Sequence, residues 1–201
     1  MNRQRQRGLT LIELLVGMTI MALLMVMAAP SLGDVLTNMR LRNTAEALGA
    51  SLQFAKGEAV ARNARVRFQL TSALDDTCTL NAAGPHWVVN IDPGASANAV
   101  EGECGAALSD TVAPRLLSRH DARENGAATV IEASAATLVF NGLGRVTPVP
   151  AGEIGFDVRS ANEVECVANG GSRSCMRVLV SAMGQIRVCN PAVAAPHPGA
   201  C

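Results

Sequence analysis

Tyrosine is absent from this chain, and its 201 residues include only one tryptophan and four phenylalanines. With so few aromatic side chains, a hydrophobic core must be built mainly from valine, leucine, isoleucine and alanine. Neither sign of charge is in excess, because 17 basic residues face 17 acidic ones. If the first eight residues are removed, 14 basic residues face 17 acidic ones. A net charge of about −3 argues weakly against an indiscriminate binder of polyanions, although it is compatible with local basic patches.

Recognisable catalytic and metal-binding patterns are missing as well. No serine lies in a G-x-S-x-G elbow, and no aspartate or serine accompanies a histidine at the spacing of a known triad. No C-x-x-C pair is present, and a zinc site would need more closely spaced ligands. We therefore predict no enzyme, no metal site and no cofactor. Surface or packing roles are expected for the three histidines, which are His86, His120 and His197.

The six cysteines all lie beyond the N-terminal third of the chain. An even number of cysteines after an apolar segment predicts disulfides in an oxidising compartment. Proximity in the sequence favours the pairs Cys166–Cys175 and Cys189–Cys201, which leaves Cys78–Cys104 as the third pair. The other pairings that six cysteines allow stay open.

An apolar run extends from Leu9 to Ala29, interrupted by the single carboxylate of Glu13. As a helix it would extend about 31 Å, which matches a bilayer core of about 30 Å. A signal peptide cut at its far end would place Pro30 directly after the cut, which is unfavourable, and a plain membrane anchor leaves Glu13 unexplained. In the third interpretation the chain is cut between Gly8 and Leu9 and keeps the span. Basic residues before the run predict that this end stays cytoplasmic.

The pattern becomes amphipathic after Pro30, which should kink the helix without ending it. Apolar residues spaced by three and four then predict a helix that continues to about Arg62 and lies on a domain. Short β-rich segments bounded by Gly, Pro, Asn or Ser follow it. These predicted strands are Val66–Leu70, Trp87–Ile91, Arg115–Leu117, Thr129–Glu132, Leu138–Phe140, Glu153–Val158, Met176–Ser181 and Gln185–Cys189.

The stretch RGLTLIELLVGMTIMALLMVMAAP resembles the class III leader and first helix of type IV pilins and pseudopilins. The resemblance implies that a prepilin peptidase cuts after Gly8 and that the new N-terminus, Leu9, is methylated. The family most often has Phe at that position, so Leu9 departs from the pattern while keeping its apolar character. Glu13 would then meet the N-terminal amine of a neighbouring subunit and set the register of docking. Cutting after Gly8 leaves 14 basic against 17 acidic residues, a net charge of about −3.

Two further stretches, TLVFNGLGRV (137–146) and RVLVSAMGQIRV (177–188), each place a glycine between short strand segments. Together with KGEAVARNARV at the junction of helix and strand, they resemble the GspH/FimT group of minor pseudopilins. The resemblance implies an α+β, pilin-like fold, with a long N-terminal helix packed on an antiparallel β-sheet domain. The expected organisation is a leader (1–8), a transmembrane helix (9–29), its amphipathic continuation (30–62) and a periplasmic β-rich domain (63–201).

The function implied is that of a minor pilin incorporated at or near the tip of a type IV pilus. The alternatives are the same part in a type II secretion pseudopilus, or a DNA receptor for natural transformation. The expected location is the bacterial inner membrane, with a single pass and the C-terminal domain in the periplasm, and then the filament. The expected partners are other minor pilins, the major pilin, the prepilin peptidase and the inner-membrane assembly platform.

Duplex DNA is a further possible partner, because FimT-like proteins carry a Gly-Arg-x-Arg motif on the C-terminal strand. Two arginines separated by one residue in a strand project to the same side, where they can contact phosphates. Here Gln185 replaces the first arginine and Arg187 keeps the second. The sequence thus offers a reduced version of the motif, to which Arg145 and Arg177 could add.

Overall fold

The computed structural model describes residues 10–94, 100–122, 129–161, 166–167, 170 and 175–201, with backbone alone for residues 26–32 and 34. The chain divides into two compact units, Met1–Thr37 and Asn38–Cys201, which we treat separately. The helix α1 (Leu11–Arg62) contributes to both. In the described residues eight strands follow it: β1 (Val66–Thr71), β2 (His86–Ile91), β3 (Leu116–Asp121), β4 (Thr129–Ala133), β5 (Thr137–Phe140), β6 (Ile154–Ser160), β7 (Met176–Val180) and β8 (Ile186–Cys189).

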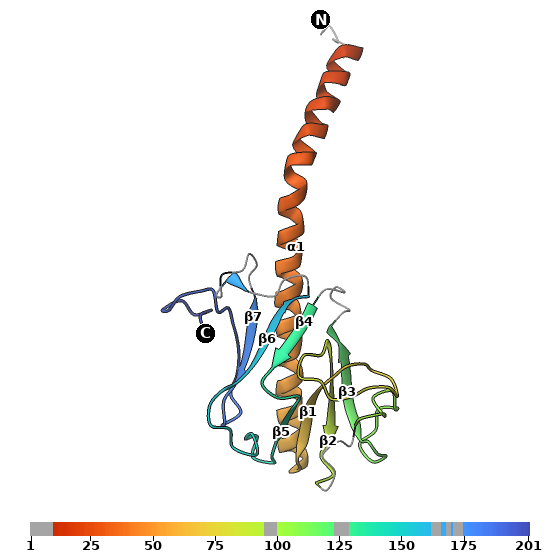
Figure 1. Ribbon diagram of the computed structural model, residues 1–201, viewed down its shortest axis with the longest axis vertical. Helices are drawn as coiled ribbons and strands as arrows, with labels where there is room; N and C mark the ends of the chain where they lie inside the picture. Colours follow the sequence, from red (N-terminus) through yellow and green to blue (C-terminus); the bar gives the residue numbers. More distant parts are fainter. Residues whose placement is uncertain (1–9, 95–99, 123–128, 162–165, 168–169, 171–174) are drawn as a thin grey trace, which may run out of the picture. The chain divides into compact units, whose positions relative to one another are not determined.

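The strands of the second unit form two antiparallel sheets of four strands each (Figure 1). Their orders are β3-β2-β1-β5 and β4-β6-β7-β8. The chain changes sheet between β3 and β4, and it returns to the first sheet for β5, which pairs with β1 through Val66↔Phe140. The predicted α+β class, with a helix packed on antiparallel sheets, is confirmed, and the division into two sheets is new.

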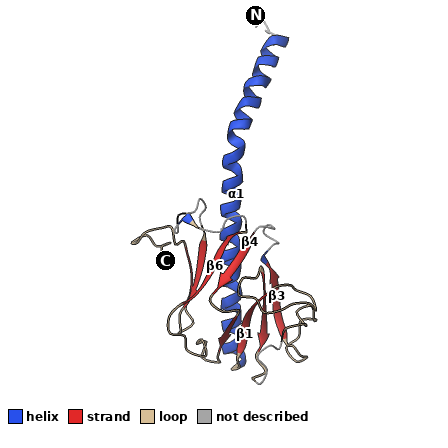
Figure 2. Cartoon of the chain, in the orientation of Figure 1, coloured by secondary structure: helices blue, strands red, loops and turns tan. Residues whose placement is uncertain are grey.

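The C-terminal part of α1 runs along the two sheets (Figure 2). One hydrophobic core, made by side chains of this part of the helix and of both sheets, joins them. Phe68 of the first sheet packs edge-to-face on Phe156 of the second, with ring centroids 5.7 Å apart. The helix supplies small and aliphatic side chains at spacings of three and four, which places them on one face. These buried helix residues are Leu41, Ala45, Leu48, Leu52, Ala55 and Ala59.

Seven of the eight predicted strands differ from the observed ones by no more than two residues at either end. The exception is β3, predicted as Arg115–Leu117 but extending from Leu116 to Asp121. His120 is therefore a strand residue opposite Trp87, and the two rings stack with centroids 4.4 Å apart. The strand was underestimated because β3 is a sheet edge, where polar residues such as Ser118 and Arg119 replace the apolar alternation.

Candidate assembly site

The first turn of α1 is closed by a reciprocal pair of side chains. Glu13 Oε2 accepts hydrogen bonds from the backbone N–H and the hydroxyl of Thr10, at 3.1 and 2.9 Å. Thr10 Oγ1 in turn accepts from the backbone N–H of Glu13 at 3.4 Å. This is a capping box, in which an N-cap threonine and an N3 glutamate satisfy the free donors of a helix start. The sequence analysis missed it, although the T-L-I-E spacing carries its signature.

The side chains after this cap form an apolar surface in the first unit. Between 50% and 78% of each large apolar side chain from Leu11 to Met25 is exposed within the single chain. A helix that is apolar on all sides needs a cover of lipid or of other protein. The residues that form this surface are Leu11, Ile12, Leu14, Leu15, Val16, Met18, Ile20, Met21, Leu23, Leu24 and Met25.

The structure does not test three of the features predicted near the N-terminus: the cleavage after Gly8, the methylation of Leu9 and the kink at Pro30. Gly8 and Leu9, the predicted cleavage and methylation positions, lie outside the described residues. The backbone of α1 is helical through Pro30, whose predicted kink stays a prediction. Within the part of the chain that the structure describes, no helix meets the length and apolarity required to cross a membrane.

The residues considered for DNA binding are partly neutralised by carboxylates in the second sheet. Arg177 donates to both carboxylate oxygens of Asp157, at 2.6 and 3.0 Å. These hydrogen bonds raise the pKa of Arg177 above its ordinary value. Arg187 donates to Glu153 at 3.3 Å across the sheet. Each pair removes net positive charge that a phosphate contact would need, which weakens the electrostatic footprint on this sheet.

The other two candidates, Arg145 and Gln185, end two turns of the same design. In Asn141–Arg145 and in Ser181–Gln185, the backbone N–H of the first residue donates to the carbonyl of the fifth. The carbonyl of the first residue accepts from the backbone N–H of the fourth. The side-chain oxygen of the first residue accepts from the fifth backbone N–H, at 3.1 Å in both turns. The fourth residue is glycine with φ +73° and +74°, in the left-handed region that glycine tolerates. We call these two segments the twin turns.

The twin turns lie against each other and against α1. A Cβ atom on Gly184 would lie 2.0 Å from the carbonyl oxygen of Gly144, so the backbones approach as closely as glycine allows. Lys56 Nζ donates to the Gly184 carbonyl at 2.8 Å, which ties both turns to the helix. The sequence shows a glycine in each hairpin, but their proximity follows only from the fold.

The six cysteines form three disulfides, and the pairs are those that proximity in the sequence favours: Cys78–Cys104, Cys166–Cys175 and Cys189–Cys201. The sulfurs of Cys78 and Cys104 lie in a small apolar cluster with Val88, Val100 and Leu116. The Cys189–Cys201 bond returns the C-terminal tail to β8, where Asn190 N–H also donates to the Gly199 carbonyl at 2.8 Å. The disulfides therefore hold long loops and the tail on a small core.

Replacing both cysteines of a disulfide by serine should lower the free energy of unfolding, and the loss should be larger for the disulfide that closes the longer loop. The Cys78–Cys104 bond closes a separation of 26 residues and the Cys189–Cys201 bond one of 12. Loop entropy predicts losses in the free energy of unfolding of about 3.5 and about 3 kcal/mol, respectively. Burial of the first pair should widen that difference, which urea denaturation of the two variants under oxidising conditions measures. A larger loss for the tail variant would contradict this ranking.

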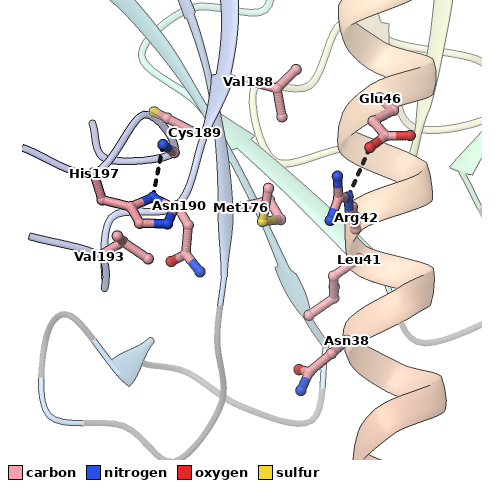
Figure 3. Close-up of a pocket in the computed structure, with 11 residues that line it drawn as sticks. Asn38, Leu41, Arg42, Glu46, Met176, Val188, Cys189, Asn190, Val193 and His197 are labelled. Carbon is pink, nitrogen blue, oxygen red and sulfur yellow. Dashed lines mark hydrogen bonds and ion pairs between the residues drawn. The ribbon is translucent and has the colours of Figure 1, made fainter.

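A pocket of about 460 Å³ separates the start of the second unit's helix from the disulfide-closed tail (Figure 3). Leu41, Met176 and Val188 form its apolar wall, and the Arg42–Glu46 ion pair, at 2.9 Å, lies on the helix side. On the tail side, His197 Nδ1 accepts from the Gly199 N–H at 3.0 Å. The described residues contain no group of three potential metal ligands.

Comparisons with known proteins give two structural likenesses and two family matches. Two crystal forms of the type IV minor pilin FimU from Pseudomonas aeruginosa resemble the chain, with 20% identity and a TM-score of 0.46, and with 21% and 0.49. They cover 73% and 74% of this chain, and 90% and 87% of the FimU chains. No curated protein matches. The family model described as type II transport protein GspH matches residues 44–184, and the prokaryotic N-terminal methylation motif matches residues 3–29.

Proposed function

Because this chain belongs to the GspH family and is a minor pilin or pseudopilin that assembles with other pilins, we propose that it is incorporated at or near the tip of a type IV pilus. The resemblance stated from the sequence is thus confirmed at the level of the family. The family is structural, and its N-terminal motif is that of membrane-anchored pilus subunits. That the filament is a type IV pilus, that the subunit lies at or near its tip, and which proteins it contacts there are parts of our proposal.

The observation that carries this proposal is the contrast along α1. Its later part is buried in the core of the second unit, with Leu48 and Leu52 at 0% exposure. Its first part leaves a continuous series of large apolar side chains exposed, from Leu11 to Met25. Apolar surface of this kind is stable in lipid or in a bundle of similar helices, so transfer from one to the other requires no refolding of the second unit.

The proposed life cycle begins with cleavage by the prepilin peptidase between Gly8 and Leu9, followed by methylation of Leu9. The apolar run 9–29 then holds the chain in the inner membrane, and residues 63–201 lie in the periplasm. Three disulfides support an oxidising compartment for that domain. From the membrane, the assembly platform would deliver the subunit to the other minor pilins and the major pilin.

The runner-up is the same role in the pseudopilus of a type II secretion system. Our preference for the pilus rests on the cysteine-rich C-terminus and the helix-to-strand junction, which resemble the FimT and FimU side of the family. Neighbouring genes distinguish the two: other minor pilins with a large adhesin-like subunit indicate a pilus, and a secretion operon indicates the pseudopilus. DNA reception stays a hypothesis from the sequence, because the ion pairs of Arg177 and Arg187 do not favour it.

Processing supplies the direct experiment. Mass spectrometry of the chain isolated from its own bacterium should find a mature N-terminus at methylated Leu9. In a strain without prepilin peptidase, the same chain should keep residues 1–8 and stay out of the filament fraction. A mature chain that starts at Ser31 would mean an ordinary signal peptide and would end this proposal.

A further inference from the structure

We propose that a face built on the twin turns binds the globular domain of a different, neighbouring filament subunit through apolar contacts flanked by that subunit's carboxylates. This inference rests on the proposed function and adds to it the location and chemistry of one contact. We call the surface formed by Val60, Leu143 and Met183, with Lys56 and Arg145 beside it, the turn face.

Exposed apolar side chains are the first evidence for the turn face. Leu143 and Met183 occupy the same third position of their respective turns, and 76% and 59% of their surfaces are exposed. Val60 of α1 is 50% exposed, and its Cγ2 lies 3.1 Å from the position that a Cβ on Gly144 would take. Gly144 and Gly184 bring the two turns together, so the three side chains belong to one region. Grouped, rigidly held apolar residues of this kind mark protein-binding surfaces.

The region is also preorganised. Each turn is closed by backbone hydrogen bonds, the Ala182 carbonyl accepts from the Val146 N–H at 3.1 Å, and Lys56 holds Gly184. Side chains presented on such a frame lose little conformational freedom on binding, which favours affinity. A groove of about 630 Å³ continues the face along α1, beside Lys56, Val60 and Gly184, and ends at Ile186 of β8. A protruding side chain of a partner has room there.

Charge indicates what the partner carries. Among the described residues, seven arginines of the second unit form ion pairs with Asp or Glu: Arg42, Arg62, Arg65, Arg67, Arg159, Arg177 and Arg187. Lys56 and Arg145 have no carboxylate partner among the residues that the structure describes, a property they share with Arg40, Arg115 and Arg119, but these two lie at the turn face. Lys56 bonds a carbonyl oxygen, and Arg145 follows Gly144 directly. Two cations without carboxylates beside an apolar face are complementary to carboxylates at the edge of an apolar surface.

The first test uses the full-length chain in its own bacterium. A double variant, Leu143→Asp and Met183→Asp, should reduce the amount of subunit in sheared filaments about tenfold or more, with its level in the membrane unchanged, because loss of buried apolar anchors of this size exceeds 1.4 kcal/mol. The matched control is Leu108→Asp with Val112→Asp, since these side chains are 55% and 68% exposed on another loop. Normal incorporation of the Leu143/Met183 variant would overturn the proposal.

The second test concerns charge and partner. Arg145→Glu should reduce incorporation severalfold, while Arg115→Glu, at another exposed arginine, should not. A photo-crosslinking amino acid at position 143 should join the chain to a different pilin, and mass spectrometry should find the linked peptide beside Asp or Glu. Links to a second copy of this chain, to phospholipid or to DNA would each overturn the assignment, as would the absence of any link at position 143.

These outcomes are separable from failure of the proposed function. If the unsubstituted chain is absent from filaments, the assembly role itself is wrong. If the unsubstituted chain is present and the Leu143/Met183 variant is present equally, the assembly role stands and only the turn face is rejected.

Discussion

Gly184→Ala is expected to lower the free energy of unfolding of the unit Asn38–Cys201 by roughly 3–5 kcal/mol, a value reached only when a core or backbone contact is broken. A Cβ atom at this position would lie 2.0 Å from the carbonyl oxygen of Gly144, and backbone cannot move aside as a flexible side chain can. The φ angle of +74° adds conformational strain. One of the twin turns would have to shift, which would also disturb the Lys56 hydrogen bond and the contact with α1.

Gly102 serves as a control that distinguishes the effect of the close contact at Gly184 from the strain that a positive φ places on alanine. Gly102 has φ +76°, but the nearest heavy atom to its Cβ position lies 3.8 Å away. Gly102→Ala should therefore cost only about 1 kcal/mol, the cost of placing an ordinary residue in the left-handed region. Guanidinium denaturation of both variants under oxidising conditions measures the two losses. Equal losses would mean that the contact between the twin turns contributes nothing to stability.

Local periodicity explains why most elements could be predicted from the sequence. Spacings of three and four in the sequence predict a buried helix face, and its later members, Leu48, Leu52, Ala55 and Ala59, are buried. The earlier members of the predicted series, Val35, Leu36 and Met39, are exposed, so this part of the prediction is wrong for the single chain. Runs such as VRFQL and WVVNI are β-rich and lie between turn residues, so β1 and β2 were predicted almost to the residue. The three disulfides follow sequence proximity because each closes a local loop, of 26, 9 and 12 residues.

Pairings between distant segments could not be predicted, because periodicity carries no information on partners. The sequences of β4 and β5 do not indicate which sheet each strand joins. Although the two strands are neighbours in the sequence, β5 pairs with β1, which lies 60 or more residues earlier in the chain. The ion pair between Arg187 and Glu153 spans 34 positions and changes the interpretation of the C-terminal strand. The contact between Gly144 and Gly184 is of the same kind. The turn face therefore had no sequence signal beyond its two glycines.

Glu13 is a different case, because its local signal was available. The sequence analysis assigned it to docking from its position in an apolar run, and the structure shows that it also caps α1 through Thr10. A capping role alone would explain a carboxylate at this position without any partner subunit. The two roles differ in what they require: capping needs a side-chain acceptor at N3, which glutamine also supplies, while docking against a cationic amine needs the charge.

Glu13→Gln is therefore expected to leave the chain in the membrane at its normal level and to reduce its incorporation into filaments at least about tenfold. The expected cause is loss of a buried charge pair with the N-terminal amine of a neighbouring subunit, a change worth several kcal/mol when one partner is removed. Glu13→Ala should be equally defective. Thr10→Ala removes the cap and keeps the carboxylate, so it should cost only about 1 kcal/mol of helix stability and still be incorporated.

Quantitative immunoblots of sheared filaments and of membranes measure the amount of subunit incorporated and its level in the membrane for the three variants. If Glu13→Gln is incorporated normally while Thr10→Ala is not, the carboxylate serves the helix start and the docking role is wrong. If the reverse holds, the charge acts between subunits, because within one chain glutamine keeps the hydrogen bonds to Thr10 that the cap requires. The pair of substitutions thus distinguishes a residue that begins a helix from one that selects its neighbour in the filament.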